Sequence, residues 1–161
     1  MKKKNGFTLI ELLIVMTIMS ILTIIAVSQF QNAKRKARDT QRKSDLSAVS
    51  KALQMFYTDY GEFPSVSPSE GVPSFDVNSL WGESFEDGDY IYMKVMPNEN
   101  LLTDNPYCYV VSGDNKSYGL FALLENTEDV QCVGNNYTCG GEEGYCYSIV
   151  SANARADEMS E

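Results

Sequence analysis

The sequence predicts an α+β protein in which one long N-terminal α-helix packs on a small antiparallel β-sheet head. Three observations predict this fold. The first 60 residues contain no proline and a single glycine, at position 6. Short runs of aromatic and β-branched residues, separated by turn signals, follow in the second half. The length of 161 residues leaves room for one modest head domain once a membrane segment is subtracted.

The long helix is expected to begin with a membrane-spanning segment over residues 7–27. This run has 21 residues and Glu11 is its only charge. At 1.5 Å per residue it would span about 31 Å, which matches a hydrocarbon core of about 30 Å. An ordinary secretory signal has an apolar core of only about 7 to 15 residues, so cleavage near Ala26-Val27-Ser28 is the weaker interpretation.

A more distinctive junction lies before the apolar run, where the basic leader MKKKNG precedes FTLIELL. This junction resembles the processing site of type IV prepilins and type II secretion pseudopilins. The resemblance implies that residues 1–6 are a leader, that a membrane prepilin peptidase cuts between Gly6 and Phe7, and that the new amino terminus of Phe7 is methylated. The leader lysines would stay cytoplasmic by the positive-inside rule.

Glu11 is the candidate assembly residue. An ionised carboxylate inside a membrane costs about 2.5 to 3.5 kcal/mol on insertion scales and is functional by default. The family resemblance implies that Glu11 of one subunit neutralises the Phe7 amine of its neighbour during assembly. The alternative is a first-turn glutamate that only complements the dipole of its own helix.

The helix is expected to continue through residues 28–60 as an amphipathic stalk, because this segment lacks glycine and proline. Its second half carries an apolar stripe at spacings of three and four residues, formed by Leu46, Val49, Leu53, Phe56 and Tyr60. Residues 28–45 lack such a stripe, so only the C-terminal half should pack on the head. Small residues recur on nearly one side of the earlier half of this helix: Ala33, Ala37, Thr40, Ser44 and Ala48. This ridge either permits close approach of another helix or is simply a solvated surface.

Charge changes sign once along the chain. Residues 28–51 hold seven basic residues against two acidic ones, whereas from Thr58 onward nineteen acidic residues face only three basic ones. The acidic head is a poor nucleic-acid surface. The basic stalk could contact phospholipid, DNA or the acidic heads of neighbouring subunits, and we favour neighbouring heads because every subunit supplies one.

The head is expected over residues 61–150, with a flexible tail at 151–161. Gly61 and Pro64 are typical of a helix end, and residues 61–89 are expected to form an irregular connecting loop. Strands are predicted at 90–96, 107–112, 117–124 and 145–150. The turn Ser112-Gly113-Asp114-Asn115 should join the middle two as a hairpin.

Four cysteines lie in the head: Cys108, Cys132, Cys139 and Cys146. An even number in a small exported domain predicts two disulfides, and four cysteines allow three pairings. The simplest pairs Cys139 with Cys146 and Cys108 with Cys132. Zinc ligation is disfavoured because the cysteines lack C-x2-C spacing and the chain has no histidine.

No catalytic residues, cofactor or metal site are predicted. The absence of histidine removes the commonest general base, and we locate no carboxylate pair suited to a hydrolase. Acidic groups at residues 86–89 and at Glu128 and Asp129 are weak calcium candidates without an EF-hand pattern. Asn115 and Asn136 begin N-glycosylation triplets, which also arise by chance.

The predicted function is that of a pilin, a structural subunit that waits in the cytoplasmic membrane and then polymerises with copies of itself into an extracellular type IV pilus. The resemblance implies a prepilin peptidase, an assembly platform and separate ATPases as partners, and adhesion, twitching motility or DNA uptake as roles. One alternative is a pseudopilin of a type II secretion system. Another is a single-pass anchored binding protein that never polymerises and keeps Gly6.

Overall fold

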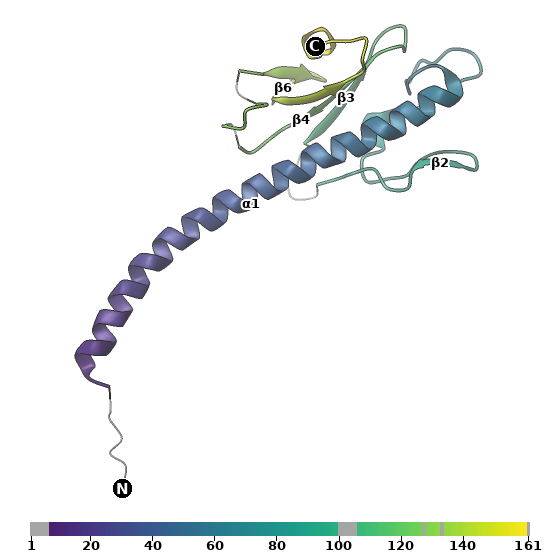
Figure 1. Ribbon diagram of the computed structural model, residues 1–161. Coiled ribbons are helices and arrows are strands. Elements are labelled where there is room, and N and C mark those ends of the chain that lie inside the picture. Colours follow the sequence, from purple (N-terminus) through teal and green to yellow (C-terminus); the bar gives the residue numbers. More distant parts are fainter. Residues whose placement is uncertain (1–6, 100–105, 127, 133, 161) are drawn as a thin grey trace. The chain divides into compact units, whose positions relative to one another are not determined.

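The computed structural model describes residues 7–99, 106–126, 128–132 and 134–160 (Figure 1). Helix α1 spans Leu9–Tyr60. The chain forms two compact units, residues 1–38 and residues 39–161, and α1 contributes to both. The α+β fold class expected from the sequence is confirmed.

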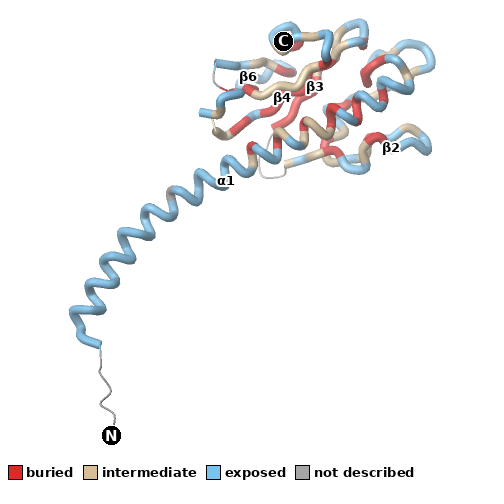
Figure 2. Tube along the Cα trace, in the orientation of Figure 1, coloured by how far each residue is buried: buried red, intermediate tan, exposed pale blue. Residues whose placement is uncertain are grey.

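The first unit consists, over its described residues, of the N-terminal part of α1. Its large apolar side chains are exposed, and Figure 2 shows this part of the helix in pale blue. It contains a segment that is long and apolar enough to cross a membrane. Thr17, Ser20 and Thr23 each donate a hydroxyl hydrogen bond to a backbone carbonyl three or four residues earlier in α1. These polar side chains therefore need no outside partner in lipid.

The second unit is built on a three-stranded antiparallel sheet in the order β3-β4-β7. The strands span Tyr107–Val111, Tyr118–Ala122 and Tyr147–Val150. β4 is the central strand and all of its residues are buried. The hairpin expected between β3 and β4 is present: Asn115 has a positive φ of 56° and its N–H donates to the Ser112 carbonyl at 2.9 Å.

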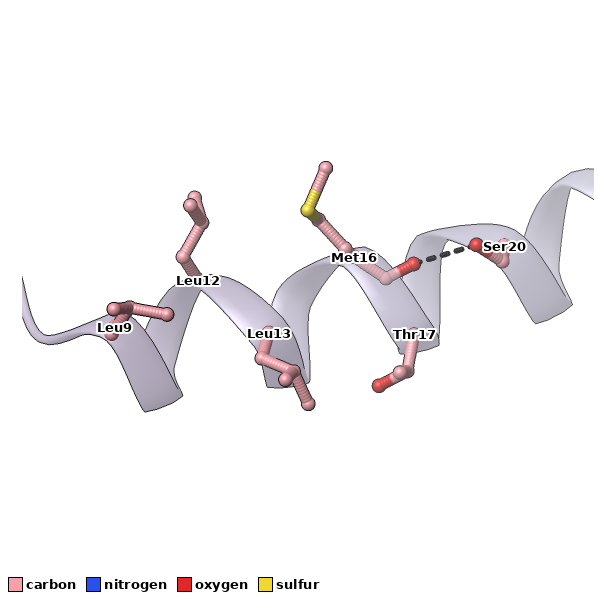
Figure 3. A pocket seen from close by; sticks show the side chains of 6 residues that line it. All are labelled: Leu9, Leu12, Leu13, Met16, Thr17 and Ser20. Carbon is pink, nitrogen blue, oxygen red and sulfur yellow. Dashed lines mark hydrogen bonds between the residues drawn. The ribbon is translucent and has the colours of Figure 1, made fainter.

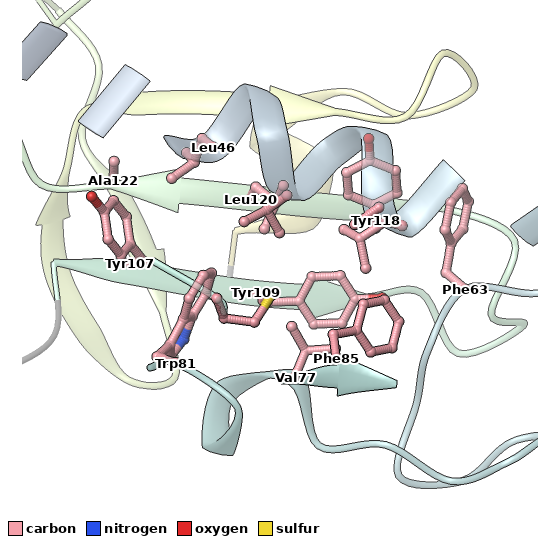
Figure 4. Close-up of a cluster of buried hydrophobic side chains, with 14 of the residues drawn as sticks. Leu46, Phe63, Val77, Trp81, Phe85, Tyr107, Tyr109, Tyr118, Leu120 and Ala122 are labelled. Carbon is pink, nitrogen blue, oxygen red and sulfur yellow. The ribbon is translucent and has the colours of Figure 1, made fainter. Parts of the chain in front are cut away.

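The main core lies between this sheet and the C-terminal part of α1 (Figure 4). Among the side chains of α1 that the structure describes, the buried ones begin at Asp39. The apolar stripe is then buried as its spacing predicts, and Leu46, Val49, Leu53 and Phe56 are fully excluded from solvent. From the sheet, Leu120 and Tyr118 point toward the helix. Burying each large apolar side chain contributes about 1.5–3 kcal/mol to the free energy of folding.

Two smaller hairpins and two short helices complete the second unit. The first hairpin joins β1 (Phe85–Asp87) to β2 (Tyr90–Met93), and the other joins β5 (Tyr137–Cys139) to β6 (Glu142–Tyr145). Phe85 and Tyr92 attach the first hairpin to Phe56, with ring centroids 5.5 and 5.3 Å away. The 3-10 helix η1 spans Val77–Ser79 and α2 spans Ala156–Met159.

A second apolar cluster contains Phe121 of β4 together with Cys108, Cys139, Tyr145 and Met159. Successive residues of a strand point to opposite faces of a sheet, so Phe121 points away from its neighbour Leu120 and the main core. Residues 151–161 were expected to form a flexible tail, but part of this segment, over its described residues, packs against the sheet. Met159 is only 7% exposed, because it covers the face of β4 around Phe121.

All four cysteines form disulfides, as expected, but the predicted pairing is wrong. The bonds join Cys108 to Cys139 and Cys132 to Cys146. In the β5–β6 hairpin Cys139 lies opposite Glu142, so Cys146 is displaced by four residues, about 13 Å along a strand. A disulfide requires Cα atoms within about 7 Å, and the hairpin therefore keeps Cys139 and Cys146 apart.

Candidate assembly site on the N-terminal helix

Of the three residues assigned to processing and assembly, Glu11 lies in the first turn of α1. Gly6 lies outside the described residues. Phe7 is 87% exposed and precedes the helix. The pairing of Glu11 with the Phe7 amine of a second copy stays a prediction.

Glu11 forms a capping box with Thr8. The Thr8 N–H and hydroxyl both donate to Glu11 Oε2, at 2.8 and 2.7 Å, and the Glu11 N–H donates to Thr8 Oγ1 at 3.3 Å. This reciprocal pattern satisfies backbone donors that a helix start leaves open. The alternative interpretation of Glu11, as a residue that stabilises its own helix start, therefore has a structural basis.

The capping box still leaves Glu11 able to bind a second group. Its carboxylate is exposed, and both hydrogen bonds from Thr8 end on the same oxygen. An ionised carboxylate has two oxygens with about four acceptor positions. Capping within one chain and pairing with an amine of another chain are thus compatible.

The apolar surface beside Glu11 is exposed and contains a shallow hollow. Leu9, Leu12 and Met16 lie along the helix with Leu13, Thr17 and Ser20, and together they line a shallow hollow (Figure 3). Spacings of three and four residues place these side chains on neighbouring turns. Such a surface is unfavourable in water and suits lipid or a second helix.

A buried charge cluster surrounds Arg42, where the C-terminal part of α1 meets the head. The Arg42 side chain is 1% exposed, and its guanidinium donates to Glu99 at 2.7 Å, to Glu125 at 3.0 Å and to Asp39 at 3.3 Å. It also donates to the Leu123 carbonyl at 2.9 Å. Burial acts to lower the pKa of Arg42, but hydrogen bonding and charge attraction from Glu99, with further attraction from the other two carboxylates, raise it overall.

Two residues of the same helix region hold the loop that follows β4. Asp39 accepts the backbone N–H groups of Glu125 and Asn126, both at 2.9 Å. Lys43 Nζ donates to Asp129 at 2.7 Å and to Gln131 at 2.8 Å. The hydrogen bond from Lys43, with one from the Gln131 N–H, lowers the pKa of Asp129.

Sequence reasoning placed Arg42 and Lys43 in a basic segment open to partners, and both are instead used inside their own head. A signal for Arg42 was available. It lies four residues before Leu46, and Asp39 lies seven before it, so both continue the spacing of the buried stripe. The charged residue types concealed this continuation.

Two of the weak calcium candidates, Asp87 and Asp129, make hydrogen bonds within the protein. The Tyr60 hydroxyl donates to Asp87, and Lys43 binds Asp129. Over the described residues, no group of three or more metal-ligating side chains is present. Of the two glycosylation triplets, Asn115 is buried and its side-chain amide donates to the Ser67 carbonyl at 3.2 Å, whereas Asn136 is exposed.

Comparison with known proteins identifies the family. Residues 1–27 match the family described as "Prokaryotic N-terminal methylation motif". Residues 29–135, more than half of the chain, match "Type II secretion system (T2SS), protein G". The chain belongs to the T2SS protein G family. This membership confirms the recognition of a pilin or pseudopilin from the junction at Gly6 and Phe7.

Individual members of the T2SS protein G family are distant relatives. The type II secretion system core protein G of Pseudomonas aeruginosa is 29% identical over 124 residues, covering 76% of this chain and 84% of that protein. Its namesake in Vibrio cholerae is 29% identical over 125 residues, covering 76% and 82%. A fimbrial protein of Neisseria meningitidis is 30% identical over 99 residues, covering 61% and 58%. No solved structure matches the chain.

Proposed function

We propose that this protein is a structural, non-enzymatic filament subunit that polymerises through its N-terminal helix after cleavage between Gly6 and Phe7. One observation carries the proposal: an exposed apolar helix surface with a single carboxylate, Glu11, in a chain of the protein G family. Before assembly the helix anchors the subunit in the cytoplasmic membrane. A prepilin peptidase, an assembly platform and ATPases act on it as partners.

Two kinds of filament fit this subunit. The family match favours a pseudopilus of a secretion system, because the relatives in P. aeruginosa and V. cholerae are secretion proteins by name. The likeness to a fimbrial protein favours a type IV pilus on the cell surface. Two disulfides in the head suit an exposed fibre, since they stabilise small domains outside the cell. Adhesion, motility and DNA uptake are roles for the surface fibre alone.

Mechanical shearing of cells distinguishes a surface pilus from a pseudopilus. Sheared surface material is examined by electron microscopy, and its protein is identified by peptide mass spectrometry. A surface pilus predicts long fibres made of this chain. A pseudopilus predicts none at native expression levels, with the chain retained in the cell envelope and secretion lost when the gene is deleted.

Processing is tested by mass spectrometry of the mature N-terminus. We expect a chain that begins with N-methylated Phe7. A mature chain that still carries Gly6 would support the anchored binding protein that does not polymerise. A start at Gln29 would identify an ordinary secretory signal.

Glu11 is tested by three variants that separate charge pairing from helix capping. Glu11→Ala removes both. Glu11→Gln removes the charge but keeps an oxygen that can accept from Thr8, and Thr8→Ala removes the capping hydroxyl but keeps the charge. If Glu11 pairs with a neighbour's amine, both Glu11 variants should be processed yet fail to assemble, while Thr8→Ala should assemble.

The opposite result would contradict pairing between subunits. Filaments at wild-type number in Glu11→Gln cells, with few in Thr8→Ala cells, would show that Glu11 acts only on its own helix. Each strain must lack a wild-type copy of the gene. Western blotting of the membrane fraction confirms that mature subunits are present.

A further inference from the structure

We propose that the β1–β2 hairpin of one subunit binds the basic segment 34–38 of α1 in a second copy of the chain. The inference rests on the proposed filament function and adds a specific subunit contact to it. The hairpin supplies acidic and apolar groups at its surface, and the helix segment supplies cations on long aliphatic stems. The two surfaces are complementary and are present in every subunit.

The acidic groups on and beside the hairpin are Glu83, Glu86 and Asp89, and all three are exposed. No lysine or arginine occurs between residues 52 and 93. Other carboxylates in this stretch accept hydrogen bonds from their own head, at Asp59, Glu62, Asp76 and Asp87. Glu70 is also exposed but lies in the loop that follows α1, away from the hairpin in sequence. Glu83, Glu86 and Asp89 therefore form the outward-facing negative charge on and beside the hairpin.

The hairpin also exposes apolar side chains that its own core does not cover. Tyr90 is 71% exposed and Ile91 57%, and Val95, two residues after the end of β2, is 61% exposed. Glu86 and Ile91 are direct cross-strand partners, and such partners share one face of a hairpin. The surface thus offers a carboxylate beside a branched apolar side chain, with an aromatic ring at the turn. An arginine can pair with the carboxylate and stack on the ring.

The hairpin is held firmly enough to act as a preformed surface. Phe85 and Tyr92 are buried in the main core, with ring centroids 5.0 Å apart. The Tyr92 hydroxyl donates to Asp59 at 2.9 Å, and the Tyr60 hydroxyl donates to Asp87. A surface that is ordered before binding loses less conformational entropy when a partner arrives.

The complementary segment is Lys34-Arg35-Lys36-Ala37-Arg38. Four of its five residues are cations, and residues 28–38 contain no acidic side chain. The next two cations, Arg42 and Lys43, are committed to carboxylates of their own head. The segment lies on a helix, so Lys34 and Arg38 are four residues apart on neighbouring turns.

A second copy fits the hairpin better than the other partners of a basic helix. Residues 39–161 carry twenty-one acidic residues against six basic ones, so a filament coated with heads repels the phosphates of DNA. Anionic lipid could contact residues 34–38 before assembly, but it leaves the acidic hairpin without a partner. Pairing between copies uses both surfaces at once.

Exposed charge pairs are individually weak and are screened over about 8 Å at physiological salt. In a filament each subunit would give and receive the contact, so its loss should appear as reduced filament number. Filaments should also dissociate more readily as sodium chloride rises from about 0.1 to 1 M, where screening shortens to about 3 Å.

The decisive experiment is a charge exchange in a strain without a wild-type copy. With each variant and the wild type overexpressed to the same level, we expect Lys34→Glu/Arg35→Glu to reduce filaments at least tenfold, and Glu86→Lys/Asp89→Lys to do the same. Combining the four changes should restore at least half of the wild-type number. Matched controls are Lys51→Glu on the same helix and Glu70→Lys elsewhere on the head, and neither should reduce filaments more than twofold.

Cross-linking identifies the partner directly. Arg35→Cys/Glu86→Cys filaments, oxidised mildly, should give a ladder of covalent multimers on a non-reducing gel, and Lys51→Cys/Glu86→Cys filaments should not. If wild-type filaments form but the Arg35→Cys/Glu86→Cys variant gives no ladder and the charge exchange gives no rescue, the inference is overturned. Charge-reversed subunits that assemble normally but no longer bind anionic vesicles or DNA would also overturn it. Absence of wild-type filaments even when the gene is overexpressed would instead refute the proposed function.

Discussion

Arg42 occupies a place on α1 where the spacing of the buried stripe calls for an apolar side chain. It lies one turn before Leu46 and is almost completely buried. Removing a guanidinium from water costs several kcal/mol, and this cost is offset only if its donors are satisfied. Glu99, Glu125, Asp39 and the Leu123 carbonyl supply these partners. A single residue thereby ties the helix to two separate parts of the head.

Replacing Arg42 by methionine should be among the most damaging single changes in the head. The variant leaves partly buried carboxylates without their cation, and breaking a buried pair in this way costs about 3–5 kcal/mol. Thermal unfolding of the detergent-solubilised chain, followed by near-ultraviolet circular dichroism, measures the loss. Lys51→Met, at an exposed position of the same helix, is the control. An equal effect of the two changes would contradict a structural role for Arg42.

The Lys43–Asp129 pair predicts a dependence of stability on pH. The folded pKa of Asp129 is lowered from its ordinary value of 3.8, so the ionised carboxylate stabilises the fold above that pH. The contribution is lost as the pH falls below about 4 and through the lower, folded pKa. Because the pair is partly exposed, it is worth about 0.2–1 kcal/mol.

Lys43→Met should therefore lower the stability at pH 7 and weaken its fall on acidification. Urea unfolding at pH 7, 4 and 3 gives both quantities. Asp129→Asn should behave in the same way, and the double variant should lose no more than either single change. Additive losses would show that the two side chains act independently.

At the scale of elements, pattern and length decided what the sequence could predict. The long helix and the β3–β4 hairpin were predicted correctly, because a stripe with helical spacing and a turn between two aromatic runs extend over many residues. β5, β6 and α2 were missed, and so were η1 and β1 in the segment expected to be an irregular loop, since each has only three or four residues. β6 begins Glu-Glu-Gly and has no β-branched residue, so its strand depends on pairing with β5 and on the Cys108–Cys139 bond.

The residues of the candidate site also fall into those that a sequence pattern reveals and those that only folding brings together. Phe7 and Glu11 could be proposed from sequence because a linear motif contains them, and their roles stay predictions. Arg42 was missed because its partners, Glu99 and Glu125, are more than fifty residues away in sequence, and only folding brings them together. The disulfide pairing was wrong because hairpin register, which short strands do not reveal, sets the distance between Cys139 and Cys146.

Gly119 in β4 should not tolerate a side chain, because α2 covers this face of the strand. A Cβ there would lie 2.8 Å from the Phe121 ring and 3.0 Å from Met159 Cβ. Gly119→Ala should lower the free energy of unfolding by about 1–3 kcal/mol, the usual cost of overpacking. Gly113→Ala, in a turn where an added Cβ meets nothing within 4 Å, should be close to neutral. Urea unfolding of both variants tests whether α2 is packed in solution.

At the scale of the whole molecule, two disulfides stabilise a head that has a modest core. The Cys108–Cys139 bond spans 31 residues and the Cys132–Cys146 bond spans 14. In the chain-entropy account the longer loop contributes more, by about 0.7 kcal/mol. Replacing both cysteines of one bond by serine should cost about 2–4 kcal/mol, with the larger loss for the 108–139 pair. Peptide mapping without reduction checks the pairing, and a Cys139–Cys146 peptide would contradict it.

The order of the bonded cysteines along the chain is alternating: Cys108, Cys132, Cys139, Cys146, with the first joined to the third and the second to the fourth. A backbone cut anywhere between Cys108 and Cys146 therefore leaves at least one bond across the break. With the pairing expected from sequence, a cut between Cys132 and Cys139 would release the C-terminal piece. A subunit with the observed pairing can be nicked once by an extracellular protease in this region, and its two fragments stay covalently joined.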